Sequence, residues 1–279
     1  MTTLTSRPGA TRALVRRAPR GDSRLTVWGG RVLFFALLIL VWHLAATGTA
    51  LRSSLSSPWD TTSAFVKLLL LPGFWLDVFY TLRSSLLGLL LAAVVGILLG
   101  LLIGASKFLY SSTAFTIDFL RTIPGLAVIP LGILVFGPSM KLDIFMIVFS
   151  ALWPIIIQTT YAAHSISREI LEMASVYRLS TSRRLFFVFL PACLPGIGTG
   201  LRLAATMSLL LAVGTQLLTG SPGIGSRITG YQEAAAYDLL YACILLAGVL
   251  GIAFNGGIRA LEKKLLGWHY TPRELERRA

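Results

Sequence analysis

Charged residues are scarce in this chain. Of its 279 residues, 13% are Asp, Glu, Lys or Arg and 55% are hydrophobic. A soluble domain carries about 25% charged residues, so the composition predicts an integral membrane protein. Cys193 and Cys243 are the only cysteines and lack metal or redox spacing, so we expect them to fill the core. The three histidines are scattered (His43, His164 and His269), and no metal site is predicted.

Enzyme motifs are also lacking. The Gly-rich stretch 219–236 has no following Gly-Lys-Ser/Thr, so it is no Walker phosphate loop. His164, Glu169 and Glu172 are close in sequence, but the water-facing side of a helix explains them without catalysis. We therefore expect no enzyme activity, and any ATP hydrolysis must come from a partner chain.

What is abundant is apolar sequence, in six stretches long enough to cross a bilayer core of about 30 Å. These stretches are 31–50, 81–104, 114–136, 142–164, 194–218 and 237–258. The predicted fold class is an all-α membrane protein with six transmembrane helices. The predicted parts are a disordered basic tail (1–30), a first helix with a mixed external segment that includes a short helix (31–80), a core of five helices with a water-facing loop at 165–185 (81–258), and a second tail (259–279).

Two of these stretches have special patterns. Small residues recur every fourth position from Gly88 to Gly104, which lets another helix approach closely. Packing within the chain is the favoured interpretation and a subunit interface the alternative. The third stretch is broken at Ile123-Pro124-Gly125 and Ile129-Pro130, and such breaks are tolerated where a segment is buried or lines a cavity.

The positive charges predict the topology. The formal net charge is +13. With the amino terminus inside, 18 of the 25 Lys and Arg fall in the tails and inner loops and four in outer loops. The positive-inside rule therefore places both termini and the loop 165–185 in the cytoplasm, with attraction to anionic lipid. Binding of RNA by the basic tail is a weaker alternative, since no aromatic residue is interleaved before Trp28; we expect no nucleic acid partner.

The segment from Glu172 to Arg202, EMASVYRLSTSRRLFFVFLPACLPGIGTGLR, is basic and amphipathic between two apolar spans. Apolar residues recur at its start, mostly every third or fourth position, and predict a short helix with one apolar face. Pro191 and Pro195 predict that no regular helix runs through its second half. We expect a short exposed helix, a turn and a broken re-entry into the membrane.

This segment resembles the cytoplasmic EAA loop of the permease subunits of bacterial ABC importers. The positions in register are Glu172, Ala174, Ser180, Leu190, Pro191, Pro195, Ile197, Gly200, Leu201 and Arg202. Met173 and Leu179 replace alanines of that pattern, and Arg178 replaces its Gly. If the turn still needs a positive φ, Arg178 costs about 1–2 kcal/mol.

The resemblance extends to RTIPGLAVIPLGILVFG (121–137) and to the stretch 239–269, which look like the nitrate, sulfonate and taurine branch. It implies a type I importer permease of the bacterial inner membrane, working as a homodimer with two cytoplasmic ATPases and an external solute-binding protein. ATP and Mg would bind to the ATPases, and this chain would hold no cofactor. The solute would be a small anion such as nitrate, a sulfonate or taurine. Bicarbonate, a thiamine-precursor pyrimidine and a riboflavin-like metabolite are alternatives.

The resemblance also assigns candidate residues. The ATPase-coupling residues are Glu172, Met173, Ala174, Ser175, Val176, Tyr177, Arg178, Leu179 and Ser180. Apolar side chains would be buried in the partner and contribute about 1.5–3 kcal/mol for each large one. The expected residues are Met173, Val176, Tyr177 and Leu179. A loop that merely reverses the chain is the alternative, but a plain connector needs far fewer residues.

Polar residues within spans usually face the protein interior or a water-filled cavity. The candidates for the translocation pathway are Arg121, Pro124, Arg202, Thr206, Thr215 and Gln216. Arg121 and Arg202 would attract an anion or, equally well, anchor their helices near the cytoplasmic surface. Thr215-Gln216 stands where the branch often has Ala-Glu, which makes the lining less negative.

An ion-coupled secondary transporter is the competing class. Such transporters show internal repeats and embedded carboxylates. We see no repeat, and Asp118 is the only acid between residues 81 and 142. A structural or signalling membrane protein is a further alternative, and co-purification of an ATPase would discriminate against it.

Overall fold

The computed structural model describes residues 24–48 and 54–265, and every regular element in these ranges is helical. Of the predicted tails 1–30 and 259–279, residues 1–23 and 266–279 lie outside the described residues. The chain divides into two units, residues 1–58 and 59–279. Within residues 24–48 and 54–265, five helices are long and apolar enough to cross a membrane, and a bent pair makes a sixth span if it is counted as one.

The first unit contains α1 (Arg24–Gly48), whose side chains are almost all exposed. It begins at Arg24 rather than at the predicted Arg31. The guanidinium carbon of Arg31 lies 5.5 Å from the centre of the Trp28 ring, a cation–π contact that supports the early turns. Trp42 Nε1 donates to the Ser56 carbonyl at 3.0 Å and ties the helix to the segment that follows it.

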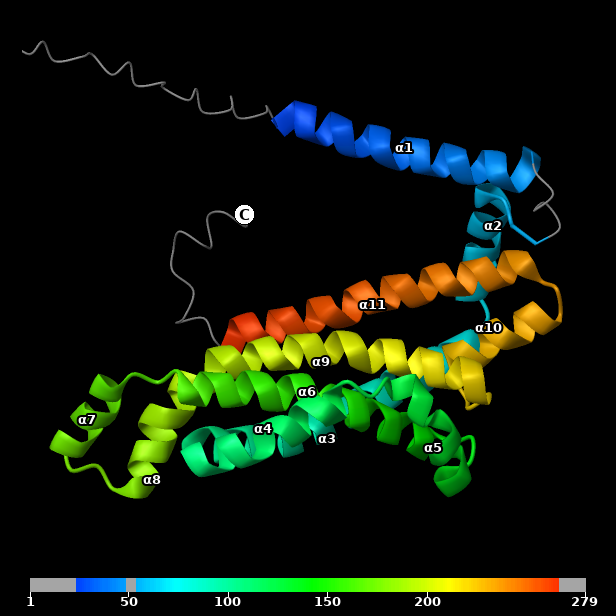
Figure 1. Ribbon diagram of the computed structural model, residues 1–279. Coiled ribbons are helices and arrows are strands. Elements are labelled where there is room, and N and C mark those ends of the chain that lie inside the picture. Colours follow the sequence, from blue (N-terminus) through cyan, green and yellow to red (C-terminus); the bar gives the residue numbers. More distant parts are fainter. Residues whose placement is uncertain (1–23, 49–53, 266–279) are drawn as a thin grey trace, which may run out of the picture. The chain divides into compact units, whose positions relative to one another are not determined.

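The second unit contains α2 (Pro58–Leu69) apart from its first residue, followed by α3 (Pro72–Ala105) (Figure 1). The prediction that α3 starts near Thr81 was wrong, because Pro72 occupies its first turn, where no backbone N–H is required. The helix therefore has 34 residues. Its end leads directly into α4 (Lys107–Arg121), where Ser106 Oγ accepts from Leu109 N at 3.3 Å.

The small-residue stripe of α3 packs against α6 (Met140–His164). A Cβ added at Gly100 would lie 2.6 Å from Thr159 Cβ, and one at Gly104 would lie 2.5 Å from Ala163 Cβ. Real Cβ atoms do not approach that closely, so glycine is needed for this helix contact. Packing within the chain, the favoured interpretation of the stripe, is confirmed.

The predicted break in the third span is confirmed. The chain passes from α4 through the 3₁₀ turn η2 (Gly125–Val128) into α5 (Ile129–Phe136), and the pair is bent by 81°. Pro124 precedes η2 and Pro130 lies in the first turn of α5, so both occupy positions where a helix tolerates proline.

After α6 the chain forms α7 (Arg168–Val176), α8 (Thr181–Arg184), the π turn η3 (Leu185–Phe189) and α9 (Leu190–Thr219). The prediction of a broken re-entry was wrong, since one unbroken helix runs from Ser182 to Thr219. Pro191 lies in the first turn of α9, next to the wider turn of η3. Pro195 lies inside the helix, beside Gly196, where a Cβ would overlap Ala162 of α6.

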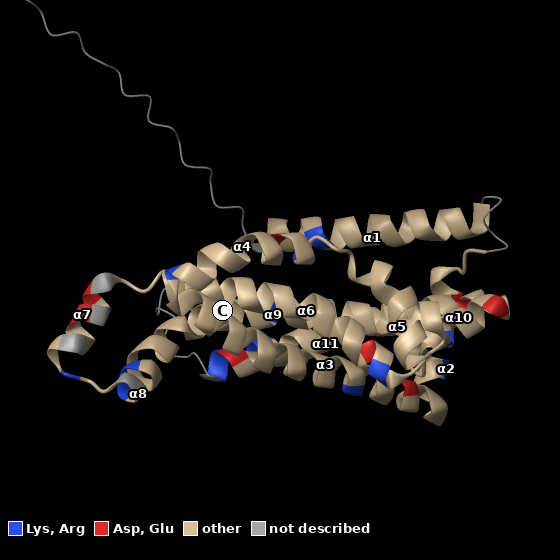
Figure 2. Cartoon of the chain, turned by 60° about the horizontal axis from the view of Figure 1, so that its bottom comes forward, with Lys and Arg blue, Asp and Glu red and all other residues tan. Residues whose placement is uncertain are grey.

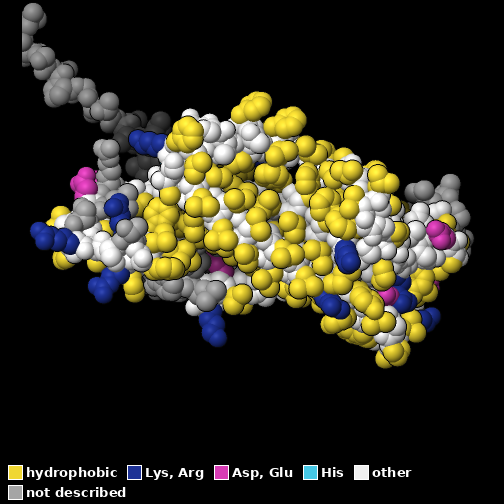
Figure 3. Space-filling view, turned by 90° about the horizontal axis from the view of Figure 1, so that it is seen from below, with side chains coloured by type: hydrophobic (Ala, Val, Ile, Leu, Met, Phe, Trp, Pro, Cys, Tyr) yellow, Lys and Arg dark blue, Asp and Glu magenta, His cyan; other side chains and the backbone are white. Residues whose placement is uncertain are grey.

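The last elements are α10 (Ile224–Glu233) and α11 (Tyr237–Leu265). The stretch 219–236, predicted as a Gly-rich loop, thus contains a short helix. Cys193 and Cys243 are both fully buried, as predicted. Apolar side chains cover the middle of the face seen in Figure 3, and charged ones gather toward its ends. This distribution suits a body surrounded by lipid.

Candidate functional site

The pair α7–α8 projects from one end of the α6–α9 helices, and α10 lies at the opposite end (Figures 1 and 2). Acidic residues are marked on α7 and basic residues on α8 in Figure 2. Glu169, in the first turn of α7, accepts hydrogen bonds from its own backbone N–H and from Ser167. These bonds hold the pKa of Glu169 below its ordinary value.

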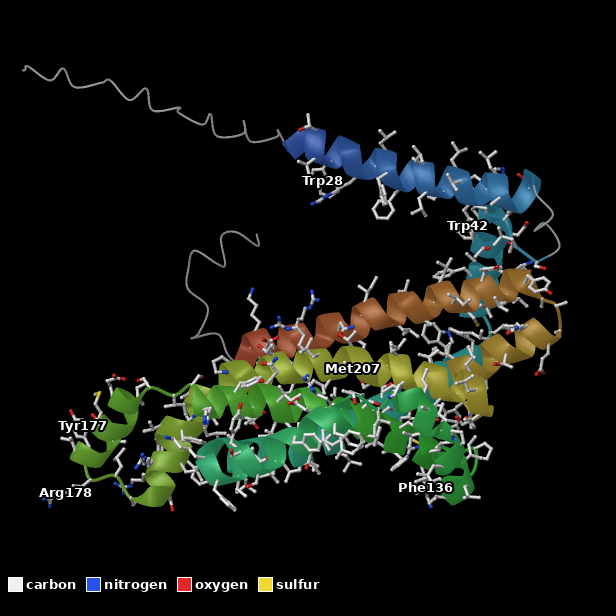
Figure 4. All side chains as sticks on the ribbon, viewed as in Figure 1. Trp28, Trp42, Phe136, Tyr177, Arg178 and Met207 are labelled. Atoms are coloured by element: carbon white, nitrogen blue, oxygen red, sulfur yellow. The ribbon has the colours of Figure 1, made fainter. Side chains whose placement is uncertain are left out.

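The far end of α7 presents a cluster of exposed apolar side chains, which we call the apolar knob. It consists of Met173, Val176 and Tyr177, which are 59%, 78% and 74% exposed. Tyr177 projects from the tip of the loop in Figure 4. Ala174 is buried and Leu179 half-buried, so these two support the helix from within. An apolar cluster that a water-facing helix leaves uncovered indicates an interaction site.

The turn after α7 has the geometry of a Schellman motif. Leu179 N donates to the Ala174 carbonyl at 3.2 Å, which is the six-to-one bond of this motif, and Tyr177 N makes the last ordinary helical bond, to the Met173 carbonyl at 3.1 Å. Arg178 occupies the left-handed position with φ +50°. The chain therefore forms the positive-φ turn that the resemblance implies. The left-handed conformation of Arg178 costs about 1–2 kcal/mol relative to an ordinary helical one.

The remaining predicted coupling residues lie beside this turn. Glu172 and Ser180 are exposed, whereas the side chain of Ser175 lies outside the described residues. Beyond Ser180 the helix of α8, η3 and α9 continues without a break and changes direction between α8 and α9 (Figure 1). The loop is thus joined by continuous helix to the middle of α9.

The six predicted pathway residues fall into three groups, and their role in transport stays a prediction. Arg121 and Pro124 line a cleft of about 490 Å³ between the α4–η2 segment, α6 and α9. Arg121 Nε lies 3.0 Å from Asp118 Oδ1, and both side chains are at least half exposed. Met207 of α9 also lines this cleft and is labelled in Figure 4.

Arg202 and Thr206 connect α9 to α11. Arg202 Nε donates to Glu262 Oε2 at 3.0 Å, and Arg202 Nη2 donates to Glu262 Oε1. Thr206 Oγ1 donates to Asn255 Oδ1 at 3.0 Å. The charge of Arg202 is therefore matched by a carboxylate that the sequence interpretation left out.

Thr215 and Gln216 are fully buried near the other end of α9. Gln216 Nε2 donates to Asp143 Oδ2 at 3.1 Å, while Gln216 Oε1 accepts from Thr81 Oγ1 at 2.8 Å. Asp143 Oδ1 accepts from Ser221 Oγ at 2.8 Å. Gln216 thus holds α3, α6 and α9 together, and it does not line the cleft.

The sequence interpretation missed Asp143, although an acid inside an apolar span is a signal that could have found it. It also missed Ser150 and Trp153, which line the cleft from α6. No pattern in the sequence distinguishes these two from other polar residues of α6.

Residues 86–267 match the family described as binding-protein-dependent transport system inner membrane component. The chain is 33% identical over 236 residues to a nitrate import permease protein of Synechocystis sp., covering 81% of this chain and 85% of that protein. It is 30% identical to a putative aliphatic sulfonates transport permease protein of Bacillus subtilis, covering 94% and 95%. It is also 30% identical to a bicarbonate transport system permease protein of Synechococcus elongatus, covering 82% and 86%.

Among solved structures, the fold resembles a chain of the MetNI methionine ABC transporter in an inward-facing conformation. The TM-score is 0.59 at 17% identity, covering 69% of this chain and 97% of that one. This likeness supports the type I permease fold. The chain therefore belongs to the inner-membrane components of binding-protein-dependent transport systems, within the branch of ABC importer permeases that includes the nitrate, sulfonate and bicarbonate permeases.

Proposed function

We propose that this chain forms the translocation pathway of an ATP-driven importer for a small anion and couples to a cytoplasmic ATPase through α7. The observation that carries the proposal is the apolar knob of Met173, Val176 and Tyr177, which this chain leaves uncovered. Burial of such side chains in a partner contributes about 1.5–3 kcal/mol each. The names of the nitrate, sulfonate and bicarbonate relatives support an anionic solute.

The assembly that follows has two copies of this chain, two ATPases that bind ATP and Mg, and an external solute-binding protein. Both termini, α7 and α8 face the cytoplasm, while α10 lies toward the outside. ATP binding draws the ATPases together and moves α7. Because helix continues from Ser182 to Thr219, this motion reaches the part of α9 that lines the cleft.

The experiment is co-purification of the ATPase with the intact chain, combined with ATP-driven uptake. Val176→Asp places a charge in the apolar knob, and we expect it to abolish co-purification of the ATPase. Ser182→Asp adds the same charge on exposed α8 and serves as the matched control. Glu172→Arg is expected to uncouple ATP use from uptake. Normal uptake by Val176→Asp and Glu172→Arg would reject this role of α7.

A further inference from the structure

α4 is packed loosely against its neighbours. None of its described residues is fully buried, whereas α6 and α9 each have many buried side chains. A cavity of about 50 Å³ lies between α3, α4 and α6, and Tyr110, Thr113 and Ile117 line it from α4. Since close packing is what fixes the position of a helix, packing alone leaves the angle of α4 weakly determined.

A single residue, Ser106, joins α3 to α4. Its backbone is extended, with φ −128° and ψ 119°, and it serves as the C-cap of one helix and the N-cap of the next. Rotation about Ser106 therefore changes the angle between α3 and α4 and leaves both helices intact. Arg121 lies 15 residues farther along α4, about 22 Å along the helix axis, and borders the cleft.

An aromatic contact spans this hinge. Tyr110, in the first turn of α4, stacks on His164, the last residue of α6. The ring centres are 4.7 Å apart and the ring planes differ by 17°. We call Tyr110 and His164 the ring pair. Because the two rings lie face to face, the ring pair limits how far α4 can tilt away from α6.

His164 is held in place by the end of α3. Its Nδ1 lies 3.3 Å from the carbonyl oxygen of Gly104. Gly104 belongs to the last turn of α3, where carbonyl groups lack partners within the helix. In the tautomer that carries its proton on Nδ1, His164 donates to this carbonyl group. One imidazole ring thus contacts the ends of α3 and α4 and belongs to the end of α6.

The ring pair is also close to α7. Three residues, 165–167, separate His164 from Arg168, where α7 begins. Among these three, Ile166 packs against the cluster of Ala163, Cys193 and Ile197 at the contact between α6 and α9. A displacement of α7 therefore acts on the end of α6 through Ile166, as well as on α9 through α8 and η3.

We propose that His164 and Tyr110 are positioning residues that make α4 follow the motion of α7. When α7 moves, the end of α6 moves with it, and the ring pair fixes the angle at Ser106 so that α4 turns as one lever. Its far end then shifts Arg121 and η2 at the cleft. This inference rests on the proposed coupling through α7 and adds a second route from α7 to the cleft.

The test uses the full chain together with its ATPase in nanodiscs. An environment-sensitive thiol dye is attached at Thr122→Cys, at the far end of α4. The chain without this substitution should take up no dye, because both native cysteines are buried. We expect ATP to shift the emission of the dye. Tyr110→Ala and His164→Ala should each reduce this shift at least about fivefold, the lower end of typical coupling between linked sites.

Three further variants separate positioning from simple loss of packing. Tyr110→Phe keeps the ring and should retain the shift. Phe108→Ala is the matched control, since Phe108 lies in the same first turn of α4 and is 77% exposed. The double variant Tyr110→Ala/His164→Ala should be no worse than either single variant, because both remove the same contact.

Co-purified ATPase shows that each variant is folded, since α7 is unchanged. Should Tyr110→Ala not fold, Tyr110→Leu takes its place, because it fills the space without an aromatic face. A full ATP-dependent shift without the aromatic ring at position 110 would overturn the inference. A Tyr110→Phe variant as impaired as Tyr110→Ala, or equal losses in Phe108→Ala, would overturn it as well.

The two proposals can be told apart when they fail. An intact chain that binds no ATPase rejects the proposed coupling through α7, and the role of the ring pair with it. A chain that binds the ATPase and shifts the dye at position 122 equally in Tyr110→Ala rejects the role of the ring pair alone.

Discussion

The side-chain amide of Gln216 donates to the carboxylate of Asp143 over 3.1 Å, although 73 residues separate them in sequence. The oxygen of the same amide accepts from Thr81, so a single side chain connects α3, α6 and α9. Polar groups buried this deeply stabilise a fold only when every partner is satisfied.

Gln216→Leu is therefore expected to lower the free energy of unfolding by about 1–3 kcal/mol, because Asp143 Oδ2 loses its amide donor and the hydroxyl group of Thr81 loses the amide oxygen as acceptor. Thermal unfolding of the full chain in nanodiscs measures this loss. Thr215→Val is the control, since Thr215 Oγ1 is buried without a hydrogen-bond partner in the described structure. Equal stability of the two variants would contradict a structural role for Gln216.

Arg178→Gly is expected to stabilise the end of α7 by about 1–2 kcal/mol, because it removes a side chain from a residue at φ +50°. The measurement is slower hydrogen exchange of the α7 amides. Arg183→Gly, in the ordinary helix of α8, should instead speed exchange around α8. Faster exchange of α7 in Arg178→Gly would show that the arginine side chain itself supports the turn.

Arg202→Ala is expected to destabilise the chain by about 3 kcal/mol, because it removes the guanidinium group that pairs with the mostly buried carboxylate of Glu262. The double variant Arg202→Ala/Glu262→Ala should recover most of this loss in thermal unfolding. A double variant no more stable than Arg202→Ala would mean that the ion pair is not what joins α9 to α11.

The first turn of α7 is expected to depend on pH through Glu169. Hydrogen bonds lower the pKa of Glu169 from its ordinary value of 4.5, so their stabilisation is complete above that value and is lost as the pH falls through the lowered pKa. A spin label at position 173 should therefore become more mobile in strongly acidic buffer. Glu169→Gln should remove most of this pH dependence, and an unchanged profile would assign it to another group.

Local patterns made much of this molecule predictable. The apolar stretches marked the spans, the period of four from Gly88 to Gly104 marked a close helix contact, and Pro124 marked the break in the third span. Each of these features depends on a few neighbouring residues. Three residues of the apolar knob were predictable for the same reason, since helical spacing alone placed Met173, Val176 and Tyr177 on one surface. Leu179, expected to be exposed beside them, is half-buried.

Other features depend on residues far apart in sequence. The sequence around Pro195 does not predict that the helix continues through this residue. The close contact between the neighbouring Gly196 and Ala162 forms only when α6 and α9 pack together. The pairing of Gln216 with Asp143 and that of Arg202 with Glu262 likewise need the assembled helices. The sequence also does not show that Ser150 Oγ and Trp153 Nε1 are buried without a hydrogen-bond partner in the described structure, because burial depends on the packing of distant helices.

The most direct test of coupling through α7 is hydrogen exchange of the full chain with and without its partner ATPase. We expect the ATPase to slow exchange in residues 168–180, where the apolar knob becomes covered, and to leave α10 at its original rate. Unchanged exchange in residues 168–180, or protection confined to α10, would contradict the account.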